Sequence, residues 1–130
     1  MTTKQILLID DSPDIHTIVQ LGLTMVTSWQ LLTALSGDEG IAQAMQHQPD
    51  AILLDVMMPV RDGVAILADL QTRPETQAIP VIFLTGNTES SDRRQLYALG
   101  AKGLIMKPFE PLTLASQIAG FLGWELEAQP

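Results

Sequence analysis

The sequence contains no cysteine among its 130 residues. This absence excludes a disulfide framework, a thiolate metal site and a cysteine nucleophile. Any metal site would have to use other ligands. Nothing in the composition indicates an oxidising compartment, so we expect a cytoplasmic protein.

Basic residues are also scarce, because seven Lys and Arg residues face 15 Asp and Glu residues and the formal net charge is -8. The seven basic residues do not form a run. A strongly acidic chain disfavours direct binding to nucleic acid or to an anionic membrane. We therefore expect protein partners, with no direct nucleic-acid contact and no membrane contact.

Long hydrophobic runs are missing as well. No apolar stretch approaches the roughly 20 residues that a membrane-spanning helix needs, and residues 1–4 lack the features of a signal peptide. The apolar content of 46% is nevertheless enough for one well-packed core. These observations predict one soluble domain.

Strand-like apolar runs alternate with helix-like segments five times along the chain. Such an alternation is typical of βα units, and right-handed crossovers then give a doubly wound parallel sheet with helices on both faces. The helix after residue 90 has the weakest amphipathic pattern. The expected strands are 5–9, 29–34, 51–55, 80–84 and 103–106, and the expected helices are about 13–25, 36–49, 62–73, 90–99 and 111–122.

An ionisable or hydroxyl residue closes four of the five strand-like runs. The pair Asp10–Asp11 follows the first run, Asp55 and Thr85 end the third and fourth, and Lys107 follows the fifth. Parallel strands bring such residues to one edge of the sheet, where ligands bind. Three carboxylates in one place repel, so either one keeps its proton or a hard divalent cation lies among them, and the lysine indicates that an anion also binds.

Each of these residues also has a structural explanation. Asp10–Asp11 could cap the first helix, which alone is about as good as a functional role. Thr85 alone is better explained by a backbone hydrogen bond. Their combination with Asp55 favours function, because an ordinary turn needs neither an acidic pair nor a lysine. His16 and His47 lack a second ligand at suitable spacing, which favours structural roles for both.

Four segments resemble the receiver domain of two-component response regulators, in order and with the spacing of that family, over nearly the whole chain. They are Ile-Asp-Asp-Ser at 9–12, Asp-Val-Met-Met-Pro-Val-Arg-Asp-Gly at 55–63, Pro-Val-Ile-Phe-Leu-Thr-Gly at 80–86 and Gly-Ala-Lys-Gly-Leu-Ile-Met-Lys-Pro-Phe at 100–109. The resemblance implies a flavodoxin-like (βα)5 fold with strand order 2-1-3-4-5. It also implies a receiver domain over 1–124 and a short tail over 125–130 without an output domain.

The resemblance further implies that Asp55 accepts a phosphoryl group from a histidine kinase or a phosphotransfer protein with the help of Mg²⁺. The remaining site residues would bind the metal or contact the phosphoryl oxygens. The implied metal ligands are Asp10, Asp11, Asp55 and the backbone carbonyl of Met57, and the implied phosphoryl contacts are Thr85 and Lys107. This agrees with the chemistry, because a carboxylate attacks a phosphoryl dianion only when cations screen the repulsion.

Three residues depart from the pattern of the family. Leu104 stands where receivers usually carry Tyr or Phe, the ring that moves inward as a Thr or Ser at the position of Thr85 moves toward the phosphoryl group. Thr85 and Leu104 are thus the expected switch positions. Gly86 replaces a common Ala, and Arg61 replaces a frequent apolar residue. Arg61 would either alter partner contacts or reach the site.

Three hypotheses follow. The favoured one is a stand-alone response regulator that signals through a surface on the fourth helix, the fifth strand and the fifth helix, to an unknown partner and with homodimerisation through the same surface. The second is a pseudo-receiver that binds proteins without phosphorylation, for which Leu104 is the motive. The third is an aspartyl phosphohydrolase, which would need a general acid where Met57 stands. We therefore expect no turnover enzyme.

Overall fold

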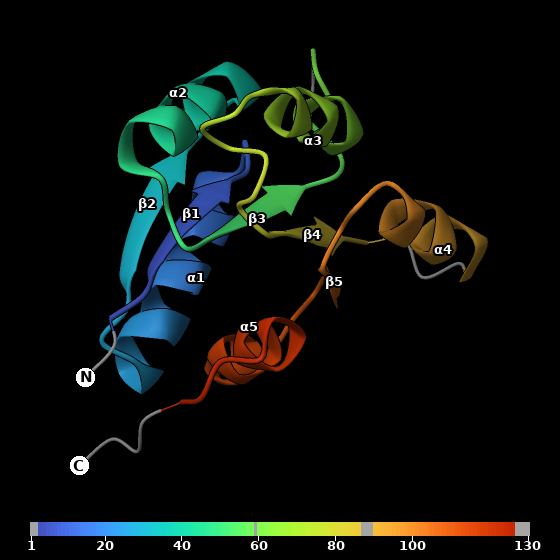
Figure 1. Cartoon of the computed structure of the whole chain (residues 1–130). Coiled ribbons are helices and arrows are strands. Elements are labelled where there is room, and N and C mark those ends of the chain that lie inside the picture. The colour runs from blue at the N-terminus through green and yellow to red at the C-terminus, as the bar shows by residue number, and fades with distance from the viewer. Residues whose placement is uncertain (1–2, 59, 87–89, 127–130) are drawn as a thin grey trace.

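Five parallel strands form a single sheet in the computed structural model, which describes residues 3–58, 60–86 and 90–126. The strand order is β2-β1-β3-β4-β5, as the sequence predicted. The strands are β1 (Gln5–Ile9), β2 (Gln30–Ala34), β3 (Ala51–Asp55), β4 (Val81–Thr85) and β5 (Gly103–Met106). Figure 1 shows this sheet between two layers of helices.

The helices cover both faces of the sheet. Figure 1 shows α2 and α3 on one side of it and α1 and α5 on the other, with α4 at the far end beside β5. The helices are α1 (Pro13–Val26), α2 (Gly37–His47), α3 (Gly63–Thr72), α4 (Ser90–Ala98) and α5 (Leu114–Leu122), and the short 3-10 helix η1 (Pro111–Thr113) precedes α5. No helix among these described residues is long and apolar enough to cross a membrane.

The core is divided into two clusters by the sheet. Every residue of β3 and β4 is buried, because helices cover both faces of these central strands. One cluster joins Ile52 and Phe83 to side chains of α2 and α3. The other joins Leu53 and Ile82 to side chains of α1 and α5. Alternate residues of each strand therefore anchor opposite layers, which holds the strand ends in register.

Local capping explains where two helices begin. The Ser36 side chain accepts a hydrogen bond from the Glu39 backbone N–H at the start of α2, and Asp62 does the same for Ala65 at the start of α3. Ser12 precedes α1 as predicted, but its side chain makes no capping hydrogen bond. The predicted boundaries agree with these observed ones to within one or two residues.

The fifth helix differs from its prediction in the first turn. Residues 111–113 form a 3-10 turn rather than α-helix, because the Glu110 carboxylate accepts a hydrogen bond from the Leu112 N–H and closes a tighter turn. The Pro111 carbonyl also packs against Gly22 of α1, where a Cβ atom would lie 2.3 Å from that oxygen. The glycine therefore allows α1 and η1 to approach closely.

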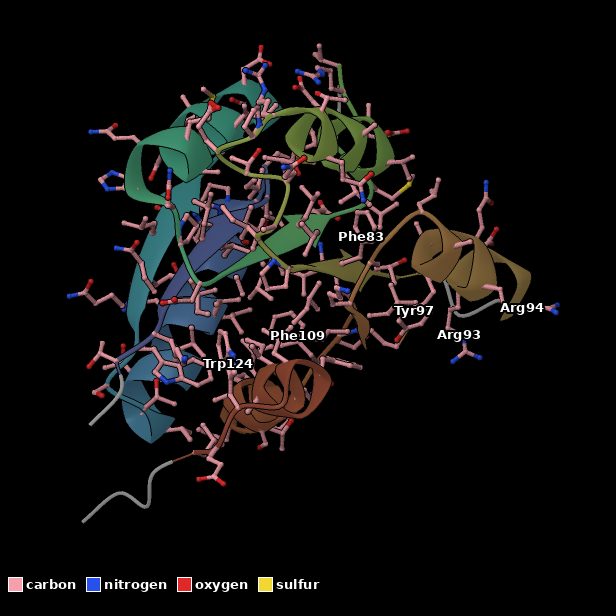
Figure 2. The ribbon with its side chains drawn as sticks, viewed as in Figure 1. Phe83, Arg93, Arg94, Tyr97, Phe109 and Trp124 are labelled. Carbon is pink, nitrogen blue, oxygen red and sulfur yellow. The ribbon has the colours of Figure 1, made fainter. Side chains whose placement is uncertain are left out.

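The fourth helix is the least firmly packed. Leu96 is its only buried residue among those whose side chains are described. Its carboxyl end is tied to α3 by a 2.9 Å hydrogen bond from the Gln71 side-chain amide to the Leu99 carbonyl. Figure 2 shows Arg93 and Arg94 extending from α4 away from the sheet, and both residues are exposed. A solvated face is the role that the sequence favours for this pair of residues.

Candidate functional site

The strand ends gather the predicted site residues at the carboxyl edge of the sheet. Asp55 ends β3 opposite Leu84, and Thr85 ends β4 opposite Met106, so Asp55, Thr85 and the following Lys107 lie on adjacent strands. Asp10 and Asp11 follow β1, the neighbour of β3 on its other side. One carboxylate oxygen from each of Asp10, Asp11 and Asp55 lies within 4.8 Å of the others. The predicted gathering of the three carboxylates is confirmed.

Lys107 reaches across the edge to two of these carboxylates. Its Nζ lies 3.1 Å from Asp10 Oδ2 and 3.3 Å from Asp55 Oδ1. The backbone N–H of Lys107 donates to the Thr85 carbonyl at 2.8 Å, and its bond to Pro108 is cis. The ammonium is thus held where it neutralises part of the charge of the cluster.

Burial and like charge act together on Asp55, whose side chain is only 6% exposed. Burial raises the pKa of Asp55, the charge of Asp10 raises it further, and the Lys107 ammonium and the Met57 N–H oppose this rise only in part. Burial lowers the pKa of Lys107, but Asp10 and Asp55 outweigh it and the net shift is upward. The lysine stays charged, and ionisation of Asp55 costs more free energy than ionisation of a carboxyl group in water.

Asp10 is completely buried and held on three sides. Its Oδ1 accepts a 2.9 Å hydrogen bond from the Ser12 N–H, and its own N–H donates to the Ala34 carbonyl. The His16 ring Nε2 lies 2.7 Å from the Asp10 carbonyl oxygen, to which it donates. The structural role predicted for His16 is confirmed, but the sequence did not reveal that it supports Asp10, since six residues separate them.

Met57 contributes to the site through its backbone. Its N–H donates to Asp55 Oδ1 at 3.2 Å, while its side chain is 77% exposed. Met side chains usually pack in the core, and the sequence favours that role for Met57. The exposure of Met57 shows that this prediction is wrong. The exposure follows from the turn that directs the N–H back toward Asp55.

The two switch positions lie deep in the sheet. Thr85 is 3% exposed, and Leu104 is 8% exposed and stands opposite Phe83 in the strand register. Leu104 belongs to the core cluster on the α2 and α3 face. Within the described part of the chain, no atom other than those of Gly86 and its chain neighbours lies within 4 Å of where the Gly86 Cβ would be. Residues 87–89 lie outside the described residues.

Arg61 makes its ion pairs with the helices rather than with the three carboxylates. Its Nη1 lies 2.8 Å from Asp38 Oδ1 of α2, and its Nη2 lies 2.8 Å from Asp69 Oδ2 of α3. It lines a pocket together with Asp11, so it stands beside the site while its guanidinium is held by α2 and α3. The sequence did not predict these ion pairs, because the partners lie 23 and eight residues away.

Comparison with known proteins decides the family. The family model of the response regulator receiver domain matches residues 6–119 of this chain. The chain belongs to the response regulator receiver family. The match lies inside the domain predicted over 1–124, and receiver domains are signalling modules rather than turnover enzymes.

Relatives and solved structures agree with this receiver assignment. The chain is 34% identical to the probable transcriptional regulator ycf27 of Cyanophora paradoxa, over 92% of this chain and 48% of that protein. It is 35% identical to the DNA-binding dual master transcriptional regulator RpaA of Synechocystis sp., over 91% of this chain and 48% of that protein. The chain thus spans about half the length of these curated relatives.

Among solved structures, the chemotaxis response regulator CheY4 of Vibrio cholerae superposes with a TM-score of 0.85 at 30% identity, over 92% of this chain and 99% of that chain. The receiver domain of sensor histidine kinase PA1611 of Pseudomonas aeruginosa has a TM-score of 0.81 at 25% identity, over 94% of this chain and 99% of that chain. That receiver is described with a magnesium ion in its active-site cleft.

Proposed function

We propose that Asp55 of this receiver domain accepts a phosphoryl group from a histidine kinase or a phosphotransfer protein in a Mg²⁺-dependent reaction. One observation carries the proposal. Lys107 lies between Asp10 and Asp55 in a cluster of three carboxylates whose oxygens lie within 4.8 Å of one another. A cation held beside a buried carboxylate is the arrangement that lets this carboxylate meet an incoming dianion.

The donor set fits Mg²⁺. Asp10, Asp11 and Asp55 supply only oxygen ligands, and Mg²⁺ is commonly bound by one or two carboxylates together with water and phosphate oxygens. Asp11 is exposed, which keeps one side of the cluster open to solvent and to a phosphodonor. When bound, the ion supplies positive charge that offsets the repulsion between the carboxylates and the phosphoryl oxygens. The Met57 carbonyl is its proposed backbone ligand.

In the proposed transfer, an Asp55 carboxylate oxygen forms a bond to phosphorus while the bond from phosphorus to the donor imidazole nitrogen breaks. The departing imidazole keeps that electron pair. Lys107 stays protonated and neutralises charge on the phosphoryl oxygens, because its pKa is raised by Asp10 and Asp55 against the opposing effect of burial. Thr85, which ends the neighbouring strand, provides a hydroxyl for the same oxygens.

The output of this receiver is proposed to use the surface of α4, β5 and α5. Leu104 has no aromatic ring that could rotate inward, and its side chain is already buried, at 8% exposure. The inward rotation of a ring that is usual in this family therefore cannot transmit the signal. The thin packing of α4, with Leu96 as its anchor in the described part of the helix, makes this helix the element that phosphorylation moves most easily. Homodimerisation through the same surface and the stand-alone architecture stay predictions.

Intact mass after incubation with Mg²⁺ and acetyl phosphate tests the proposed acceptor. We expect one added phosphate on the chain, none on Asp55→Asn and none when a chelator removes the metal. The matched control is Asp50→Asn, which changes a carboxylate on the opposite edge of the sheet and should be modified like the unaltered chain.

If neither acetyl phosphate nor a histidine-kinase donor adds phosphate, the phosphoacceptor proposal is wrong. The chain would then be a protein-binding module that does not depend on phosphorylation. Sedimentation of the chain over a concentration series, with and without a phosphoryl analogue, tests the dimer. A monomer at every concentration in both states would rule it out.

A further inference from the structure

The loop that joins β3 to α3 carries part of the site and is packed unevenly. It begins directly after Asp55, and the Met57 N–H donates to the Asp55 carboxylate. Val56 and Met58 pack against the core, whereas Met57 is 77% exposed and Val60 is fully exposed. Side-chain burial therefore holds the first part of the loop but not the segment at Val60.

Val60 shows that the loop is held in an unfavourable conformation. Its φ is 68°, in the left-handed region, although Val is β-branched and has no local hydrogen bond to offer in return. A non-glycine residue keeps such a conformation only where the surrounding structure imposes it. Something next to Val60 therefore has to fix the path of the backbone.

Arg61 is the adjacent residue and joins the loop to two helices. Its guanidinium makes a 2.8 Å ion pair with Asp38 at the start of α2 and a 2.8 Å ion pair with Asp69 of α3. Arg73 holds the other oxygen of Asp69, with 2.7 Å between Arg73 Nε and Asp69 Oδ1. Asp69 is thus fixed from both sides, which makes it a rigid point of attachment for Arg61.

The two ion pairs of Arg61 are not equal. The Asp38 side chain is 84% exposed, and pairs in contact with bulk water contribute little because water and salt screen them. The Asp69 side chain is 22% exposed and belongs to the network with Arg73. The ion pair with Asp69 therefore contributes most to holding Arg61 in place, and the ion pair with Asp38 mainly orients the guanidinium group.

We propose that Arg61 is a positioning residue for the phosphorylation site. By attaching the β3–α3 loop to Asp69 and Asp38, it holds Val60 in its left-handed conformation and fixes the Met57 backbone beside Asp55. The Met57 N–H is then kept on the Asp55 carboxylate, and the Met57 carbonyl, the proposed backbone ligand, would be kept in place with it. This inference rests on the proposed Mg²⁺ site, on which Arg61 would act only through the loop.

The test compares Mg²⁺ binding with folding stability in the same variants of the whole chain. Mg²⁺ is titrated into isotope-labelled protein, and the Kd is taken from the shifts of backbone amide resonances. Urea unfolding in the presence of a chelator measures stability without the metal. In Arg61→Gln we expect the Kd for Mg²⁺ to rise about tenfold, the lower end of what lost support around a metal ligand costs.

Three further single variants and one double variant distinguish a positioning role of Arg61 from a role that only joins surface elements. Asp69→Asn should raise the Kd nearly as much as Arg61→Gln, and Asp38→Asn should raise it less. Combining Asp69→Asn with Arg61→Gln should add almost nothing to the Kd of the single variants, because both remove the same interaction. Arg73→Gln is the graded control: it leaves both ion pairs of Arg61 in place and removes only the far support of Asp69, so stability falls while the Kd rises much less than in Arg61→Gln.

The inference is wrong if Arg61→Gln lowers stability while the Kd for Mg²⁺ stays at its original value, since Arg61 would then only join surface elements. It is also wrong if Arg73→Gln raises the Kd as much as Arg61→Gln. Failure of the proposed function would look different, because the unaltered chain itself would then neither bind Mg²⁺ nor accept phosphate. Should Arg61→Gln fail to fold, the Asp69→Asn and Asp38→Asn pair answers the same question with Arg61 intact.

Discussion

The two edges of the sheet carry different kinds of side-chain contact. At the carboxyl edge, Asp10 and Asp55 are buried beside each other with Lys107 between them. At the amino edge, Trp29 and Trp124 meet edge to face with ring centroids 5.5 Å apart, and the Lys4 ammonium lies 4.6 Å from the Trp124 ring centroid. Figure 2 shows Trp124 beyond the end of α5.

The proposed chemistry therefore belongs to the carboxyl edge, and the aromatic contacts that stabilise the fold belong to the amino edge. Buried like charges at the carboxyl edge lower the stability of the fold, and the pKa of Asp55 is raised by burial and by the charge of Asp10, both of which a bound cation would offset. Aromatic contacts at the amino edge stabilise the fold and touch no site residue. Substitutions at the carboxyl edge should therefore abolish phosphorylation, whereas a substitution at the amino edge should lower stability and leave phosphorylation unchanged.

The largest effect is expected from Gly63→Ala at the carboxyl edge. A Cβ atom at Gly63 would lie 2.4 Å from the Asp55 carbonyl oxygen and 3.0 Å from the Phe83 ring, so α3 and the end of β3 have to move apart. We expect a loss of about 3 kcal/mol in urea unfolding, together with loss of phosphorylation. Gly120→Ala is the control, because apart from the local backbone nothing in the described residues lies within 4 Å of its Cβ position and Ala favours a helix. Equal stability of the two variants would contradict this packing.

Trp124→Ala at the amino edge should have the next largest effect, and on stability alone. The substitution removes the contacts with Trp29 and Lys4 from a half-buried ring. We expect a loss of about 2 kcal/mol, below the value for a fully buried Trp. Phosphorylation by acetyl phosphate, measured well below the unfolding temperature, should be unchanged. A parallel loss of phosphorylation would show that the two edges are coupled.

Asp55→Asn should shift stability in the opposite direction. The amide removes a buried charge that faces Asp10, and burial together with that charge raises the pKa of Asp55. The variant should therefore be more stable than the unaltered chain at neutral pH in a chelator, by less than the Trp124 change costs, while accepting no phosphate. Adding Mg²⁺ should narrow this gap, because the ion stabilises the unaltered chain. A lower urea midpoint for Asp55→Asn in the chelator would contradict the expected charge repulsion.

The smallest effect is a pH dependence at Asp69. Hydrogen bonds from Arg73 and then Arg61 lower its pKa from the ordinary value of 3.8. A lowered pKa means that the ionised form stabilises the fold above pH 3.8 and that this contribution is lost as the pH falls through the folded-state value. The stability difference between the unaltered chain and Asp69→Asn should therefore be constant near neutrality and shrink below pH 3.8.

Salt provides the check on this prediction. In about 1 M NaCl, where the screening length is about 3 Å, the difference between the unaltered chain and Asp69→Asn should already be smaller at neutral pH. A difference that neither acid nor salt reduces would mean that packing, rather than charge, accounts for the effect of Asp69.

Much of the fold and of the site was open to prediction from local patterns. Continuous apolar runs located the strands and helical spacing located the helices, and Asp62, which caps α3, stands at the predicted start of that helix. The 3-10 turn at Pro111 was missed, since it depends on the Glu110 side chain and on close packing against Gly22. Local patterns contain no information on such packing.

The contact partners of individual side chains were harder to predict from the sequence. Leu104 was identified from its position as a residue without a ring, but its burial opposite Phe83 depends on the strand register. The contact of His16 with the Asp10 carbonyl depends on how α1 leaves the sheet. Arg61 was left between two roles, because its long side chain has several rotamers and only the placement of α2 and α3 selects one.

The sequence by itself determined the order of the elements and which residues close each strand, because hydrophobic periodicity is local and parallel strands necessarily end at one edge. The tertiary structure alone decided that Lys107 meets Asp10 across 97 residues and that Arg61 is attached to Asp69 rather than to the site. These contacts arise from the twist and spacing of whole elements, which bring together side chains that no sequence interval relates.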